Sequence, residues 1–167
     1  MNRLDSAHRA FERLLEYIVI LLMVAMFLVI VAGVSFRKAG AALVWYDEVA
    51  EILLCWLTYY GAALAALKRA HIGVPTLVRM ASEGVRRLCF VVAEGTVFAF
   101  FALFAWAGAR ILPVLEFDFM TTIPEISTQY TYSVIPIGAV LFMIAQALSL
   151  PTAWRKSVSP AVAPLAH

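Results

Sequence analysis

The sequence predicts an all-α integral membrane protein with four transmembrane helices, short interfacial amphipathic helices and both termini in the cytoplasm. Of the 167 residues, 63% are hydrophobic and only 14% are charged, whereas a soluble domain is about 45–50% apolar and about 25% charged. Four apolar runs each reach the roughly 20 residues that a helix needs to cross a bilayer. One membrane domain is expected to occupy residues 1–167.

The four transmembrane spans are expected at about residues 15–36, 44–67, 88–111 and 129–150. The first run carries no charge from Tyr17 to Phe36 and is longer than the apolar core of a signal peptide, which favours an uncleaved helix. The second run keeps its three acids near its start. The third contains one acid, Glu94, and the fourth is uncharged up to Pro151, which is a natural stop.

Two segments outside the spans are predicted to lie on the membrane surface. Residues 2–13 are polar, with apolar side chains at helical spacing, which is typical of an interfacial helix. A frayed tail is the alternative, because isolated short helices are unstable. Residues 75–86 begin with a proline suited to the first turn of a helix and are rich in arginine, so the same interfacial arrangement is predicted there.

The distribution of basic residues predicts the orientation. Ten of the 13 lysines and arginines lie in the N-terminal segment, the second loop and the tail, and three lie in the first and third loops. Because cytoplasmic loops are enriched in lysine and arginine, both termini are placed in the cytoplasm. The net charge of only +2 gives no basic footprint for nucleic acid, so membrane lipids are the expected surroundings.

The sequence does not predict catalytic chemistry. Cys55 and Cys89 are isolated in apolar runs, and the three histidines lie outside the predicted spans. These positions disfavour a thiol oxidoreductase and a haem-binding bundle, and with them a membrane enzyme or redox subunit. No metal ion or cofactor is therefore expected in this chain.

Glu94 is the one acid well inside a predicted span. It follows Arg87 by seven residues, or about 10 Å along a helix. Such a carboxylate can mark an ion or proton path. It can also be a buried or protonated group bonded to a neighbouring helix, or a side chain that reaches the inner membrane interface, and these interpretations remain open. Near the other end of the same span, Arg110 is a candidate partner for Glu48 or Glu51 at the start of the second span.

The second span is predicted to pack closely against other helices. One face carries residues at three- and four-residue steps: Glu48, Glu51, Cys55, Thr58, Ala62 and Ala65. Glycine and alanine dominate its second half, and small residues allow helix backbones to approach closely in lipid. Trp45 lies where an interfacial aromatic belt is expected, whereas Trp56 lies deeper and needs a polar partner.

Several of these residues together resemble a family signature. The order is Trp45-x-Asp47-Glu48, then Trp56, then Gly61-Ala62-Ala63, then Lys68-Arg69-Ala70-His71-Ile72-x-Val74. This series resembles the small membrane subunit, DctQ type, of tripartite ATP-independent periplasmic (TRAP) transporters. In the last span, Tyr132 followed by Ile135-Pro136-x-Gly138 is also similar to that family.

The resemblance implies a small permease subunit in the bacterial inner membrane. Such a subunit braces a large multi-span elevator subunit during sodium-coupled uptake of an organic acid, which a periplasmic binding protein delivers. Substrate and sodium would be bound by the large subunit. The interface candidates are Trp45, Asp47, Glu48, Glu51, Trp56, Gly61, Ala62, Ala65, Arg69 and His71.

The acidic third loop offers candidate contacts for the binding protein, namely Glu116, Asp118 and Glu125, with a solvated loop as the alternative. The alternative function from a different class is a self-sufficient small proton-coupled transporter that uses Glu94. A gene for a large permease beside this one would favour the subunit, whereas transport by the chain alone would favour the self-sufficient transporter.

Overall fold

The computed structural model describes residues 3–69 and 82–158, and it confirms an all-helical protein with four candidate spans. The long helices are α1 (Arg3–Lys38), α2 (Tyr46–Leu67), α4 (Glu83–Ile111) and α6 (Val134–Val158). The short ones are the 3₁₀ helix η1 (Leu115–Phe117) and α5 (Thr128–Tyr132). The segments long and apolar enough to cross a membrane are His8–Lys38, Tyr46–Leu67, Glu83–Ile111 and Thr128–Pro151. The chain is therefore a multi-pass membrane protein.

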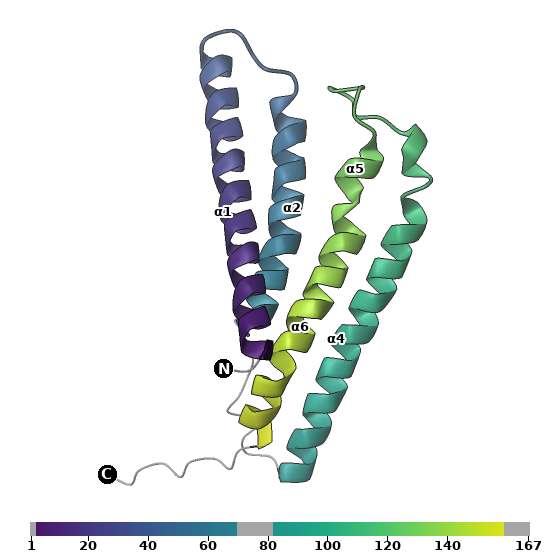
Figure 1. Cartoon of the computed structure of the whole chain (residues 1–167). Helices are drawn as coiled ribbons and strands as arrows, with labels where there is room; N and C mark the ends of the chain where they lie inside the picture. The colour runs from purple at the N-terminus through teal and green to yellow at the C-terminus, as the bar shows by residue number, and fades with distance from the viewer. Residues whose placement is uncertain (1–2, 70–81, 159–167) are drawn as a thin grey trace, which may run out of the picture.

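The four long helices are arranged in an order that differs from their order in the chain. α1 packs on α2, α2 packs on α6, and α6 packs on α4 (Figure 1). The last helix of the chain thus lies between the second and third spans. The α1–α2 pair and the α4–α6 pair are close at one end and diverge toward the end that carries the α1–α2 loop and α5 (Figure 1).

The buried core lies toward the end where the helix pairs converge. Its members are Leu15, Ala63, Ala66, Leu67, Phe142 and Ala145. Ala63 and Ala66 of α2 and Ala145 of α6 are fully buried, and their small side chains allow the two helices to approach closely. From α4, the ring of Phe101 stacks on that of Phe142, with ring centroids 3.8 Å apart.

Two glycines mark further close approaches between helices. A side chain at Gly33 of α1 would collide with the ring of Tyr46 at the start of α2. A Cβ at Gly138 of α6 would lie 2.7 Å from the Cβ of Tyr59 on α2. The absence of a side chain at these two positions therefore allows α2 to pack closely against α1 and α6.

Most apolar side chains of the spans point away from the protein. Only 39% of the most apolar window of the fourth span is buried within the chain, and no more than 11% in the other three. A soluble monomer does not expose apolar surface on this scale. The outward faces are consequently covered by lipid or by other membrane subunits.

The structure differs from the sequence-based expectation at the N-terminal segment. α1 begins at Arg3 and continues without interruption into the first span, so residues 3–13 form its first turns and not a separate helix. No proline or glycine occurs before Gly33 to end the helix earlier. Of the second interfacial segment, residues 75–81 lie outside the described residues, and residues 83–86 belong to the first turn of α4.

Candidate functional site

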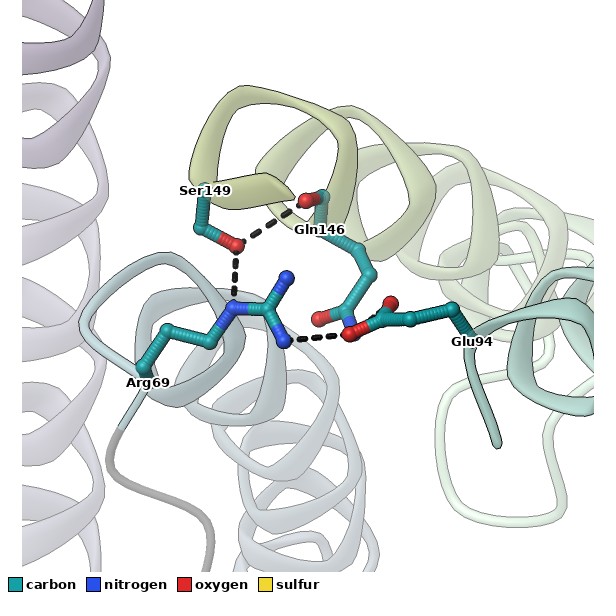
Figure 2. A network of polar contacts seen from close by, with 4 residues as sticks. All are labelled: Arg69, Glu94, Gln146 and Ser149. Atoms are coloured by element: carbon teal, nitrogen blue, oxygen red, sulfur yellow. Dashed lines mark hydrogen bonds and ion pairs between the residues drawn. The ribbon is translucent and has the colours of Figure 1, made fainter. Parts of the chain in front are cut away.

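A polar cluster joins three helices at the end where the helix pairs converge (Figure 2). The Arg69 guanidinium pairs with the Glu94 carboxylate, with Nη1 and Oε1 2.5 Å apart. The Gln146 amide donates to the other Glu94 oxygen at 2.7 Å. Arg69 Nε donates to the Ser149 hydroxyl at 2.8 Å, and that hydroxyl donates to the backbone carbonyl of Gln146 at 2.9 Å. The cluster therefore connects the end of α2 with α4 and α6.

The backbone at Arg69 directs its side chain into this cluster. α2 ends at Leu67, Lys68 is its C-cap, and Arg69 has a left-handed backbone with φ of 51°. That conformation costs a non-glycine residue about 1–2 kcal/mol. The contacts of the guanidinium with Glu94 and Ser149 offset this cost, and the positive charge also suits the C-terminal end of the α2 dipole.

The cluster is largely shielded from its surroundings. The Glu94 side chain is only 12% exposed and that of Arg69 29%, while Gln146 and Ser149 are buried. Within the described residues, Arg69 Nη2 and Gln146 Oε1 are buried without a hydrogen-bond partner. Both oxygens of Glu94 thus have partners, whereas one donor group of Arg69 and one acceptor of Gln146 have none among the described residues.

Lys68 extends the same connection to the remaining long helix. Its ammonium lies 2.5 Å from Glu16 and 3.4 Å from Glu12, both on α1. The hydrogen bond to Glu16 is the main reason that the pKa of Lys68 is raised above its ordinary value. We call Lys68, Arg69 and their partners the Lys-Arg clasp; these partners are Glu12, Glu16, Glu94, Gln146 and Ser149. Two consecutive basic residues thereby tie α2 to α1, α4 and α6.

At the opposite end of the molecule, Glu48 holds the loop of residues 112–127. Its carboxylate accepts hydrogen bonds from the Thr121 and Thr122 amides, at 3.0 and 2.9 Å, and from the Thr122 hydroxyl. Among the described residues, Arg110 forms no ion pair with Glu48 or Glu51, the two partners suggested by the sequence, and Glu48 binds the loop. Arg110 instead lies over the ring of Trp106, one turn away on α4, at 5.3 Å from its centroid.

Bonds within the loop of residues 112–127 give it a defined shape. Phe119 and Ser127 form an isolated antiparallel bridge, and the Met120 amide donates to the Ile126 carbonyl at 3.1 Å. The Ser127 hydroxyl donates to the Leu115 carbonyl at 3.0 Å. All three acids predicted to contact a binding protein, Glu116, Asp118 and Glu125, are exposed on this loop.

The structure separates the predicted interface residues into two groups. Those with contacts inside the chain are Glu48, Trp56, Arg69, Asp47 and Ala62, the last of which packs against the buried core. Trp56 donates through its indole to the Thr131 carbonyl at 3.1 Å, and Asp47 pairs with Arg37 at 3.4 Å. Trp45 and Glu51 are exposed, Ala62 and Ala65 are partly buried, and His71 lies outside the described residues.

One face of α2 is left uncovered by the part of the chain that the structure describes. Glu51, Leu54 and Thr58 are exposed at three- and four-residue steps, and a side chain added at Gly61 would meet no atom within 4 Å. We call these four residues the open α2 face. The opposite side of the helix, which includes Ala63 and Ala66, is fully buried against α1 and α6.

Sequence reasoning identified Glu94 and Arg69 separately but missed their contact. It also missed Gln146, Ser149, Thr121 and Thr122. One signal was present, since Arg69 follows the end of one span and Glu94 lies about two turns into the next, antiparallel one, a difference in depth that a long arginine side chain can reach across. No group of three or more His, Cys, Asp or Glu in the described ranges, 3–69 and 82–158, is arranged to hold a metal ion.

Comparison with known proteins agrees with the fold and with the earlier resemblance. The family model described as "Tripartite ATP-independent periplasmic transporters, DctQ component" matches residues 26–156. The sialic acid TRAP transporter permease protein SiaT of Haemophilus influenzae (strain 86-028NP) is 26% identical over 145 residues, which cover 84% of this chain and 23% of that protein.

A second relative is the C4-dicarboxylate TRAP transporter small permease protein DctQ of Rhodobacter capsulatus. It is 28% identical over 104 residues, which are 61% of this chain and 45% of that protein. The chain thus spans less than half the length of both curated relatives. Since the family match covers most of the chain, the protein belongs to the DctQ family of components of tripartite ATP-independent periplasmic transporters.

Proposed function

We propose that this protein is the small permease subunit of a TRAP transporter and braces a large elevator subunit in the bacterial inner membrane. The observation that carries the proposal is the Lys-Arg clasp. Its charged side chains, including the intramembrane carboxylate of Glu94, bind one another and fix all four long helices. An elevator moves against a part that stays still, and a four-helix unit locked at one end is suited to be that part.

The open α2 face is the proposed contact with the large subunit. Its small and polar members would allow a helix of another chain to pack closely. Trp45 lies exposed at the start of the same helix and would add an aromatic contact at the membrane boundary. Ala62 and Ala65 flank this face and are part of the proposal.

In this proposal, substrate and sodium are bound by the large subunit, and this chain carries no cofactor. Both termini lie in the cytoplasm, so the Lys-Arg clasp is on the cytoplasmic side and the loop of residues 112–127 faces the periplasm. The names of the relatives refer to sialic acid and C4-dicarboxylates, which supports an organic acid as the solute. A periplasmic binding protein would deliver it, with Glu116, Asp118 and Glu125 as contact candidates.

The rival function is a self-sufficient proton-coupled transporter that works through Glu94. In the structure, both oxygens of Glu94 are engaged, one by Arg69 and one by Gln146. A proton-carrying carboxylate must release such partners in each cycle, whereas a structural one keeps them. The geometry therefore supports the bracing role.

Reconstitution into liposomes tests the proposal. The large subunit, this chain and the binding protein should together give sodium-driven uptake of the organic acid, and omission of this chain should abolish it. This chain should also co-purify with the large subunit. A crosslinkable residue introduced at Gly61 should form crosslinks to that subunit. Uptake by this chain alone that is lost in Glu94→Gln would establish the rival function.

A further inference from the structure

The periplasmic loop of residues 112–127 exposes large apolar side chains, and hydrogen bonds within the loop hold its backbone in a defined conformation. Phe117 is 83% exposed, Val114 73% and Phe119 54%. Flexible loops commonly turn such side chains inward. Here the 3₁₀ helix η1 and the bridge between Phe119 and Ser127 determine where the phenylalanines lie. Exposed aromatic side chains on an ordered loop are typical of a surface that another molecule covers.

The charges of the loop indicate what kind of molecule covers it. Glu116 and Asp118 flank Phe117, and Glu125 follows in the same loop. The sequence contains no lysine or arginine between Arg110 and Arg155. Insertion of the phenylalanines into lipid would carry the neighbouring carboxylates toward hydrocarbon, which is costly. A protein with an apolar cleft and a basic rim fits both properties at once.

Glu48 prepares this surface from a different part of the chain. It lies on α2, more than 70 residues before the threonines that it binds. Its carboxylate satisfies two loop amides and one hydroxyl with a single side chain. A loop that is ordered before binding loses less conformational entropy when the complex forms. Glu48 is therefore placed to strengthen docking without touching the partner.

We propose that Phe117 and Phe119 are the anchors with which this subunit docks the periplasmic solute-binding protein, and that Glu48 is the positioning residue that orders them. The inference rests on the proposed function and adds to it the anchor residues and the means by which they are held. The carboxylates of Glu116 and Asp118 contribute the surrounding charge, and the phenylalanines contribute most of the affinity.

The complete three-component transporter in liposomes provides the test. Uptake is measured as a function of the concentration of binding protein, which separates docking from the later steps. In the combined variant Phe117→Ala/Phe119→Ala, the concentration for half-maximal uptake should rise about tenfold or more, as for the loss of anchor residues. The maximal rate should stay the same. Phe36→Ala removes a partly exposed phenylalanine from α1 and should leave both quantities unchanged.

Variants of the Glu48 contact test the positioning role. Glu48→Gln replaces one acceptor oxygen by a donor, so the half-maximal concentration should rise several-fold. In the Phe117→Ala/Phe119→Ala background it should have little further effect, because Glu48 acts through those rings. Thr122→Val removes the hydroxyl and should act in the same direction, whereas Thr122→Ser should restore the wild-type value. Glu83→Gln, in the Glu83–Arg87 pair at the start of α4, is the matched control.

Two results would overturn the inference. One is an unchanged half-maximal concentration in the phenylalanine variants, with the transporter assembled and active. The other is a loss of assembled transporter from the membrane at an unchanged half-maximal concentration, which would make the loop a lipid anchor. Both differ from failure of the proposed function, in which omission of the whole chain leaves uptake unaffected.

Discussion

Replacement of Glu94 by glutamine should destabilise this subunit more than its modest change in size implies. The variant leaves the Arg69 guanidinium in a largely shielded site without the carboxylate that lies 2.5 Å from it. Removal of one partner of a buried ion pair costs about 3–5 kcal/mol. The Arg69 side chain is 29% exposed, so water or lipid headgroups screen part of its charge. We therefore expect the free energy of unfolding to fall by about 3 kcal/mol, the lower end of this range.

Thermal unfolding of the purified chain in mild detergent measures this effect. For a chain of this length, each 1 kcal/mol lowers the midpoint by about 2–4 °C, so Glu94→Gln should lower it by about 6–12 °C. The matched control is Glu83→Gln, the same substitution on the same helix. Glu83 pairs with Arg87 one turn away, and both side chains are at least half exposed, so the midpoint should shift by less than about 2 °C.

A double variant distinguishes loss of the pair from a nonspecific defect. Arg69→Gln/Glu94→Gln removes both charges and leaves none unpaired, so its midpoint should lie above that of Glu94→Gln alone. The reasoning would be refuted by a Glu94→Gln midpoint within 2 °C of wild type. It would be refuted equally by a double variant whose loss equals the sum of the two single losses.

Three further substitutions follow from the packing and the charges. Gly33→Ala should cost about 1–3 kcal/mol, seen as a lower midpoint, because its methyl group would overlap the ring of Tyr46; an unchanged midpoint would show that α1 and α2 can separate freely. Gly61→Leu meets open space and should leave the midpoint of the isolated chain unchanged while it reduces co-purification with the large subunit; full recovery of the complex would exclude this face as the interface. The raised pKa of Lys68 means that its pairing with Glu16 stabilises the fold fully below pH 10.5 and loses this effect as the pH rises through the higher folded-state value; the midpoint of Lys68→Met should therefore differ from wild type at pH 8 and approach it at higher pH, and a constant difference would contradict the assignment.

The fold could be predicted because its signals are local. Runs of apolar residues long enough to cross a bilayer determine where the spans occur, and each run is read without knowledge of its neighbours. The helix bounds differ from the predicted ranges. α2 begins at Tyr46, two residues after the predicted start of the span at residues 44–67. α1 begins at Arg3, 12 residues before the predicted span of residues 15–36. The polar residues before this span also favour a helix, but a prediction from hydropathy alone includes only the apolar residues.

The contacts of the candidate site were harder to predict because they join distant parts of the chain. Arg69 and Glu94 are 25 residues apart, and Glu48 and Thr122 are 74 residues apart. The spacing of residues in the sequence assigns Glu48 to one face of α2. It does not show that backbone amides of the loop of residues 112–127 donate hydrogen bonds to its carboxylate. The order of the helices has the same difficulty, because no local pattern places α6 between α2 and α4.

The position of α6 between α2 and α4 has a consequence for biosynthesis. As the ribosome releases the polypeptide, the α1–α2 hairpin can form early, since its two helices are consecutive and pack on each other. α4 acquires its packing partner only after α6 has emerged. A nascent chain cut short before Val134 would leave α4 without its packing partner and Glu94 without the hydrogen bond from Gln146. Synthesis of α6 is thus a condition for α4 to acquire its packing partner.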